Sequence, residues 1–213
     1  MKDFRTNLSA AQRGDEEAFA AIWRHFQPSL LRYLKVKDTA LADDLAADTW
    51  LKVLGALPAF EGNEAGFRAW LFTIARNRRT DWYRGAATKL VLVETTQLAL
   101  LADVNDVEVD AEEDLATDEI LDLISQLTTD QAEAVALRIV AGLDVAAVAT
   151  IMGRSAGSVR VLCHRGLRTL ERMLDRAVFE AEETETMTTF AAPAEAADPT
   201  EGAGLQPEAI LNG

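Results

Sequence analysis

The chain has 213 residues, enough for one medium domain or two small ones, and its hydrophobic fraction of 49% is ample for packed cores. A single cysteine, Cys163, excludes an intrachain disulfide and a metal site built from several cysteines. The formal net charge of -14 argues against nucleic-acid binding only if the acidic residues are spread evenly.

The acidic residues are instead concentrated in two segments. Residues 94–122 contain 11 Asp and Glu, residues 177–213 contain 8, and neither segment has a Lys or Arg. The rest of the chain keeps 16 acids against all 21 Lys and Arg, which leaves it with a net charge of +5. This remainder can bind DNA phosphates although the protein as a whole is acidic.

Targeting and membrane signals are weak in this sequence. The N-terminal stretch MKDFRTNLSAAQRGDEE lacks the apolar core of a signal peptide. No apolar run approaches the length that spans a bilayer. We therefore expect a cytoplasmic protein with no membrane insertion.

Residues 15–84 contain a first group of predicted helices. Their apolar side chains recur at steps of three and four residues, which is helical rather than strand spacing. Asp15 is suited to cap the first helix, Pro28 to begin the second, and Pro58 with two glycines marks a loop. We expect a compact bundle of four helices, near residues 15–26, 28–36, 39–56 and 66–85.

The fourth predicted helix combines cations with aromatic rings. In FRAWLFTIARNRRTDWYRG (67–85), Phe67 and Trp70 belong to an apolar stripe and are expected to pack in the core. The polar and aromatic side chains that follow suit unpaired bases, which stack on rings while arginines hold the backbone. The candidate DNA-binding residues here are Arg76, Asn77, Arg78, Arg79, Trp82, Tyr83 and Arg84.

Two segments have compositions that disfavour a packed core. Residues 90–114 pass from an apolar stretch into DVNDVEVDAEED, where charge repulsion and few aromatic residues predict a linker. Residues 178–213 are rich in Ala, Glu, Thr, Pro and Gly, and we expect a disordered acidic tail. A regulatory contact of this tail with the basic helices is the alternative.

Helical spacing over residues 115–174 predicts three further helices. Within them, DVAAVATIMGRSAGSVRVL (144–162) has the spacing of a helix-turn-helix. Ala149 is small where two helices would cross, and Gly153 can take the left-handed conformation at the turn. Ser155 stands where the second helix needs an N-cap.

The second helix of this motif carries many cations and few acids. Side chains near its start suit base edges in the major groove, whereas arginines farther along suit phosphates. The candidates are Ser155, Ser158, Arg160, His164, Arg165, Arg168 and Arg172. Cys163 and His164 do not indicate a metal site, because adjacent ligands on a helix point about 100° apart. We expect no metal and no cofactor.

Three blocks in this order resemble a known family. They are DDLAADTWLKVL (43–54), FRAWLFTIARNRRTDWYRG (67–85), and the stretch from LTTDQAEAVALRIVAGL to GSVRVLCHRGLRTL (127–170). With the helices between them they are similar to bacterial sigma factors of the sigma-70 family, specifically the short extracytoplasmic-function class.

The resemblance implies an all-α protein of two small helical domains without catalytic residues. A region 2-like bundle would occupy residues 1–89 and a region 4-like helix-turn-helix domain residues 115–177, joined by the acidic linker 90–114 and followed by the tail 178–213. Such a protein would bind core RNA polymerase, recognise and melt the minus-ten element, and read the minus-thirty-five element. An anti-sigma factor would be a further partner.

The resemblance also implies a polymerase-binding role for the helix near residues 39–56. The residues concerned are Asp43, Asp44, Leu45, Asp48, Trp50, Leu51 and Lys52. The three acids could equally form a solvated face, and Leu45 and Trp50 could belong to the core. Ala47 stands where the family often has Gln. The linker, in turn, could imitate nucleic acid in a polymerase channel or serve as a solvated spacer.

Three other functions stay open at this point. A helix-turn-helix regulator would bind a palindromic operator without stable polymerase binding. A helical enzyme would need a nucleophile, phosphate-loop or metal pattern, and none stands out. An interaction protein that binds basic partners through its acidic segments would leave the clustered arginines unexplained.

Overall fold

A computed structural model describes residue 1, residues 3–88 and residues 119–190. The predicted linker 90–114 and the tail beyond residue 190 lie outside these residues. All regular structure in the described ranges is helical, which confirms the predicted all-α fold. The chain divides into two units, residues 1–174 and residues 175–213.

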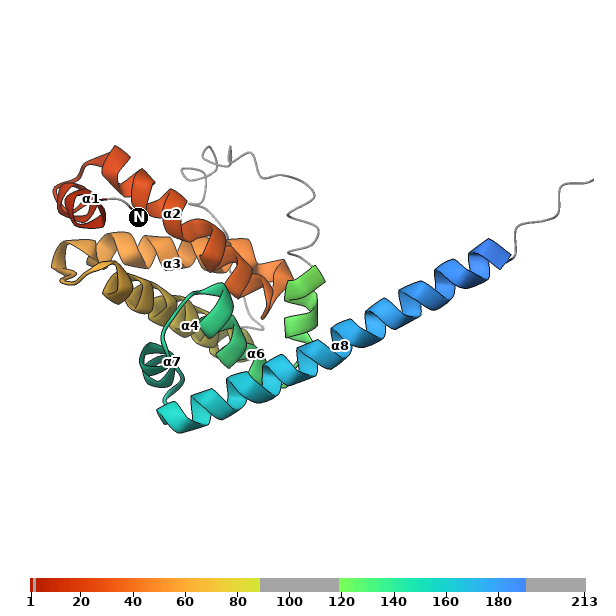
Figure 1. Cartoon of the computed structure of the whole chain (residues 1–213). Coiled ribbons are helices and arrows are strands. Elements are labelled where there is room, and N and C mark those ends of the chain that lie inside the picture. The colour runs from red at the N-terminus through yellow and green to blue at the C-terminus, as the bar shows by residue number, and fades with distance from the viewer. Residues whose placement is uncertain (2, 89–118, 191–213) are drawn as a thin grey trace, which may run out of the picture. The chain divides into compact units, whose positions relative to one another are not determined.

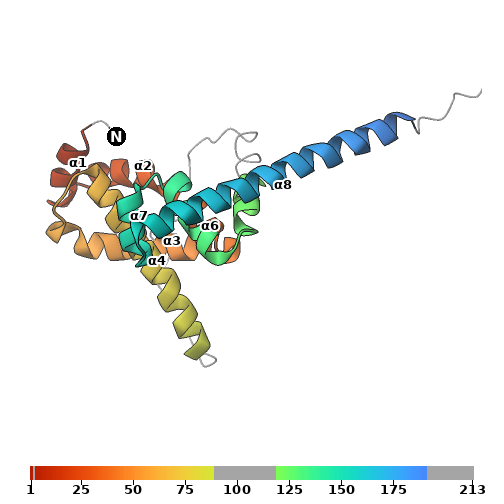
Figure 2. The same ribbon diagram turned by 60° about the horizontal axis from the view of Figure 1, so that its bottom comes forward.

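The N-terminal half consists of four α-helices and two short 3-10 turns (Figure 1). The elements are α1 (Phe4–Ala11), α2 (Glu16–Lys35), η1 (Thr39–Leu41), α3 (Ala42–Ala56), η2 (Leu57–Ala59) and α4 (Glu64–Thr88). Helices α1 and α3 contact α2, and α4 packs on α3 and α2. The last turns of α4 project beyond this bundle (Figure 2).

The core of the bundle follows the predicted apolar spacing. On α2, Ile22, Phe26 and Leu30 are fully buried, and Phe67 and Leu71 of α4 are buried against them. The ring centroids of Phe26 and Phe67 lie 5.1 Å apart. Burial of each such side chain stabilises the fold by roughly 1.5–3 kcal/mol before entropy costs. The prediction that Phe67 belongs to the core is confirmed.

Helix α2 differs from the two helices predicted near 15–26 and 28–36. It begins as expected, since the Asp15 carboxylate accepts the Ala18 N–H at 2.9 Å, but it continues through Pro28 to Lys35. A proline inside a helix costs about 3 kcal/mol through its missing N–H and its ring. Burial of Leu30 and Leu34 beyond the proline offsets that cost. Pro28 therefore lies inside one helix rather than at the start of another.

The second half contains more helical elements than the three predicted. A helical segment at 119–125 precedes α6 (Thr129–Val135), the π-helix η3 (Ala136–Val140), α7 (Val145–Met152) and α8 (Ala156–Phe190). Helix α8 continues through residues 178–190, which were expected to be disordered. This part of the sequence has no Gly or Pro, and four of its 13 residues are Glu, a good helix former. The prolines and glycines of the tail come only later.

The helix-turn-helix motif forms as its sequence predicts. Gly153 takes the left-handed conformation (φ 64°, ψ 38°) that ends α7. The Ser155 hydroxyl accepts the Ser158 N–H at 3.1 Å and caps α8. Val148 and Val159 are fully buried between the two helices.

Helix α8 also crosses α6 at close range. A Cβ placed on Gly166 would lie 2.7 Å from a methyl carbon of Val135. Gly166 is therefore needed for the two helices to approach this closely.

No single helix in the described ranges has both the length and the apolar character needed to cross a bilayer. The pair formed by α7 and residues 156–176 meets those two criteria only when taken together, and it is bent by 101°.

Candidate nucleic-acid interface

The predicted minus-ten residues lie on the second half of α4. The buried stripe of Phe67, Leu71 and Ala75 orients this helix, so the cations and rings that follow leave the bundle surface. Asn77 and Arg84 are exposed, and Arg78 is half-buried. All three residues lie on the second half of α4, and the end of this helix projects beyond the bundle (Figure 2).

Two aromatic rings on this element are accessible. The side chains of Trp82 and Tyr83 are 41% and 46% exposed, and their ring centroids lie 5.3 Å apart. The Tyr83 hydroxyl donates a hydrogen bond to Asp38 at 2.6 Å, and this bond, with partial burial, raises the pKa of Tyr83. Trp82 presents a ring face of the kind on which an unpaired base stacks.

Arg76 and Arg79 are paired with a buried carboxylate of the C-terminal half. Arg76 Nε lies 2.7 Å and Arg79 Nη2 lies 3.4 Å from the carboxylate oxygens of Glu133 in α6. The side chains of Arg79 and Glu133 are only 13% and 6% exposed. The sequence contains no local signal for this pairing, since Glu133 lies 57 residues from Arg76.

A second aromatic pair joins the loop before α4 to that helix. Phe60 and Trp70 stack with ring centroids 4.8 Å apart and an interplanar angle of 28°. Both side chains are half-buried, so Trp70 packs at the edge of the core rather than at its centre.

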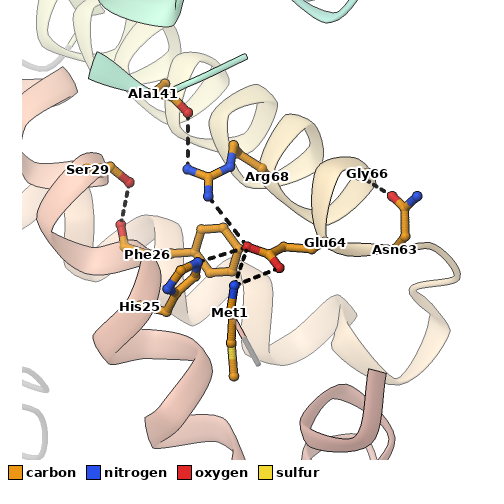
Figure 3. A network of polar contacts seen from close by, with 9 residues as sticks. All are labelled: Met1, His25, Phe26, Ser29, Asn63, Glu64, Gly66, Arg68 and Ala141. Carbon is orange, nitrogen blue, oxygen red and sulfur yellow. Dashed lines mark hydrogen bonds and ion pairs between the residues drawn. The ribbon is translucent and has the colours of Figure 1, made fainter. Parts of the chain in front are cut away.

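A polar network fixes the start of α4 (Figure 3). The Glu64 carboxylate accepts from the Met1 amino group at 3.0 Å and lies 2.9 Å from His25 Nε2. Partial burial of Glu64 opposes ionisation, but the hydrogen bonds from Met1 and His25 outweigh it and lower its pKa. Arg68 lies over the Phe26 ring and donates to the Ala141 carbonyl at 3.2 Å. Sequence analysis did not identify His25 or Glu64, whose spacing carries no known motif.

The predicted minus-thirty-five residues lie at the start of α8 and along it. Arg160, His164, Arg165, Arg168 and Arg172 are exposed, as is Ser155, while Ser158 is half-buried. Four of them, His164, Arg165, Arg168 and Arg172, line a shallow groove of about 500 Å³ together with Gln131 and Thr169. The guanidinium of Arg172 donates to the Arg168 carbonyl at 3.1 Å, which holds it along the helix.

Cys163 faces the neighbouring helix rather than this groove. Its thiol is half-buried and lies 3.5 Å from the Ala134 carbonyl, and burial raises its pKa. A thiol with a raised pKa is a poor nucleophile and a poor metal ligand. The described residues contain no group of three or more His, Cys, Asp or Glu side chains placed to hold a metal ion.

The predicted polymerase-binding residues on α3 form an exposed set and a buried set. Asp43, Asp44, Asp48, Leu51 and Lys52 are exposed. Leu45 and Trp50 are instead 1% and 2% exposed, and the Trp50 indole N–H donates to Gln27 at 2.6 Å. The sequence left two interpretations of Leu45 and Trp50 open, a polymerase contact or core packing. Their burial agrees with core packing.

The exposed face of α3 includes an apolar patch formed by Leu51, a predicted polymerase-binding residue, and Leu54, which the sequence did not single out. The side chains of Leu51 and Leu54 are 50% and 39% exposed and lie one turn apart. Their three-residue spacing resembles that of the buried residues, so only tertiary packing distinguishes the two faces.

Comparisons with known proteins match both halves of the chain. Residues 17–88 match Sigma-70 region 2, and residues 117–170 match Sigma-70, region 4. Over 173 residues the chain is 35% identical to the ECF RNA polymerase sigma factor BldN of Streptomyces coelicolor, covering 78% of this chain and 64% of that protein. Over 154 residues it is 33% identical to the ECF RNA polymerase sigma factor SigC of Mycobacterium tuberculosis, and the match covers 72% of this chain and 80% of that protein.

A solved structure shares the fold. It is the sigma factor RpoE of Bartonella quintana, crystallised with the anti-sigma factor NepR. The match has a TM-score of 0.54 and 23% identity, and it covers 74% of this chain and 96% of that chain.

Proposed function

Because the chain belongs to the extracytoplasmic-function sigma factors of the sigma-70 family, we propose that it binds core RNA polymerase and directs promoter-specific initiation. It would recognise and melt the minus-ten element with its N-terminal half and read the minus-thirty-five element with its C-terminal half. The protein would act in the cytoplasm as an initiation factor without catalytic residues of its own.

The observation that carries this proposal is the placement of two separate basic helices. Helix α4 lies in the part that matches region 2, and the basic start of α8 lies in the part that matches region 4. A protein with one DNA-reading helix binds one element, whereas two on different halves suit a site with two unlike elements.

On α4, the exposed side chains suit an opened strand. Trp82 offers a ring for base stacking, while Arg78 and Arg84 offer cations to phosphates. Stacking requires a base to leave the duplex, so this binding energy is available only after the strands separate. Melting would then be driven by binding alone.

On α8, the helix-turn-helix suits duplex DNA. Ser155, Ser158, Arg160 and His164 stand near the N-terminal end of the helix, the end that contacts base edges in this motif. Arg165, Arg168 and Arg172 follow and would hold phosphates, which fix position rather than sequence.

For core polymerase, we propose the exposed face of α3. Its two accessible leucines, Leu51 and Leu54, are flanked by Asp48 and Lys52. An apolar centre with a charged rim is the usual composition of a protein-binding patch. Leu45 and Trp50 would support this face from beneath rather than touch the partner.

We further propose the domain limits 1–89 and 115–177, an acidic linker at 90–114, and an anti-sigma factor as a second protein partner. The relatives support the last point only by analogy, since the RpoE structure contains the anti-sigma factor NepR.

Transcription from a promoter library tests the proposal. Purified core polymerase is assayed with and without this protein, and transcripts are sequenced. We expect initiation from a small set of promoters with two spaced, unlike elements, only when both components are present. Failure to bind core polymerase would defeat the assignment, and a palindromic site bound without polymerase would favour an operator-binding regulator.

A further inference from the structure

An exposed valine lies among the predicted minus-thirty-five residues of α8. The side chain of Val161 is 49% exposed, and Val161 follows the fully buried Val159 by two residues. Two residues correspond to about 200° around an α-helix, so the Val161 side chain points away from the core. The sequence did not single out this residue, because a valine offers neither a charge nor a hydrogen bond.

The neighbours of Val161 on the helix surface are residues proposed to contact DNA. Residues three and four positions apart are neighbours on an α-helix. Ser158, His164 and Arg165 therefore surround Val161, and all three belong to the predicted minus-thirty-five set. A duplex that meets these side chains also meets the valine.

Neither core packing nor helix stability accounts for this valine. Val161 lies outside the apolar cluster formed by the described residues. A β-branched side chain is also a weaker helix former than alanine. Single exposed apolar residues are common on protein surfaces, but Val161 is enclosed by polar and cationic DNA-binding candidates. Its position favours a partner that is apolar at one point within a polar surface.

The helix surface next to Val161 is open. One turn before it stands Gly157, which is exposed and has no side chain. A Cβ placed on Gly157 would lie 3.9 Å from the Ser155 hydroxyl oxygen, an ordinary contact distance, so the fold does not require glycine there. The missing side chain lets the short valine approach base edges when the helix lies in a major groove.

Thymine is the base that matches such a surface. In the major groove it presents the O4 acceptor together with a C5-methyl group, and apolar side chains recognise this methyl group by direct contact. The valine side chain has one strongly preferred χ1 rotamer in a helix, which holds its methyl groups in place. Adenine, guanine and cytosine present no methyl group at this edge.

We propose that Val161 is a specificity-determining residue of the minus-thirty-five interface, and that its methyl groups contact the C5-methyl group of one thymine. The element must then contain a thymine on one of its strands. This inference rests on the proposed reading of the minus-thirty-five element by α8, and it adds the identity of one base to that role.

Replacement of thymine by uracil tests the contact, because uracil lacks the C5-methyl group and keeps the O4 acceptor. The probes are labelled duplexes of one promoter found in the transcription assay, each with a single thymine of the minus-thirty-five element replaced by uracil. Gel shift measures their binding by the full chain in complex with core polymerase. We expect one replacement to weaken binding about fourfold, the value of one buried methyl group.

Val161→Ala removes both methyl groups of the side chain and introduces a better helix former. We expect this variant to bind the thymine duplex about fourfold or more weakly than wild type does. The critical uracil replacement should then have no further effect, because both changes remove the same contact. If Val161→Ala loses helical circular dichroism, Val161→Ser takes its place.

Leu167→Ala is the matched control. Leu167 lies on the same helix and is 45% exposed, close to the 49% of Val161. It stands six residues later, about 120° around the helix from Val161, and so outside the proposed contact. This variant should keep the wild-type affinity and the full effect of the uracil replacement.

Equal binding of all thymine and uracil duplexes by wild type would overturn the inference and leave the proposed function standing. So would a minus-thirty-five element without thymine, or a uracil effect that persists at full size in Val161→Ala. Absence of any promoter-specific transcription would instead reject the proposed function, and the assignment of Val161 with it.

Discussion

At the residue scale, tertiary burial decides which chemically similar side chains can meet a partner. Trp50 and Trp82 are both tryptophans in segments that suggested an interface, yet Trp50 is 2% exposed and Trp82 is 41% exposed. Leu45 and Leu51 differ in the same way on α3. The accessible member of each pair is the one whose loss should affect binding rather than folding.

Trp82→Ala should weaken binding of a fluorescein-labelled pool of single-stranded oligonucleotides of random sequence by roughly 1–3 kcal/mol, the value of one stacked base, with little effect on the melting temperature. Fluorescence anisotropy measures the affinity. Ile120→Ala removes a comparably exposed apolar side chain, 52% accessible, from the other half of the chain. Equal affinities of the two variants would remove Trp82 from the DNA-binding surface.

Leu51→Ala should weaken binding of core polymerase by more than about 1 kcal/mol, because truncation of a central apolar contact costs at least this much in protein interfaces. Ile139→Ala, at a side chain that is 60% exposed, serves as control. Surface plasmon resonance on immobilised core polymerase measures both. Equal affinities of Leu51→Ala and Ile139→Ala for core polymerase would show that the polymerase does not bind the exposed face of α3.

At the scale of elements, helix ends and crossings follow from a few small residues. Asp15, Gly153 and Ser155 set helix ends through local hydrogen bonds or a left-handed turn. Gly166 acts differently, since its role depends on a neighbouring helix. Gly157 and Gly166 both lie in α8, but their surroundings differ. Substitution by alanine is therefore expected to change stability in opposite directions at the two positions.

Gly166→Ala should destabilise the protein by roughly 1–3 kcal/mol, the usual cost of overpacking, because its Cβ would lie 2.7 Å from a Val135 methyl carbon. Gly157→Ala should instead stabilise it by up to about 1 kcal/mol, since alanine is the better helix former. There the new Cβ would meet only the Ser155 hydroxyl, at 3.9 Å. Urea unfolding measures the free energy of unfolding of the Gly166→Ala and Gly157→Ala variants. A Gly166→Ala variant as stable as wild type would mean that α6 and α8 cross less closely.

At the scale of the whole molecule, the segregation of charge reconciles an acidic protein with DNA binding. With 19 of the acids in residues 94–122 and 177–213, the basic parts of α4 and α8 belong to a remainder whose net charge is +5. Within residues 1–174, the two halves share an apolar cluster and are also joined by polar contacts, one of which is made by Lys37. Because Lys37 is partly buried, the contribution of this contact to stability depends on pH.

Burial lowers the pKa of Lys37 to about 8, although the negative charge of Glu133 opposes this change. Between about pH 8 and the ordinary lysine value, the unfolded state binds more protons than the folded state, so stability rises with pH. From pH 8 to 9.5, wild type should gain at most about 1.4 kcal/mol per pH unit relative to Lys37→Met. Below that window the difference between the two should be constant.

Guanidinium unfolding at pH 7, 8 and 9.5 measures this difference. Lys52→Met, at an exposed lysine of α3, should follow wild type at every pH. A difference between wild type and Lys37→Met that does not change with pH would show that Lys37 is solvated rather than buried between the halves.

Features that depend on short stretches of chain follow from the amino-acid sequence alone. Apolar spacing predicted the helices and much of the core, and capping chemistry predicted Asp15, Gly153 and Ser155, because these signals act within a turn or two. A few local signals were overridden or missed. The helix continues through Pro28 because residues on both sides are buried. Helix α1 was not predicted, although Phe4, Leu8 and Ala11 have helical spacing.

The packing of distant helices, in contrast, determines which of the predicted site residues are accessible. Arg76 and Arg79 are indistinguishable from Arg78 in sequence, yet they are held by Glu133, which lies 57 and 54 residues away. Trp50 is buried while Leu51, its neighbour, is exposed. Burial and ion pairing depend on which distant helices pack together, and that information is spread over the whole chain rather than contained in any motif.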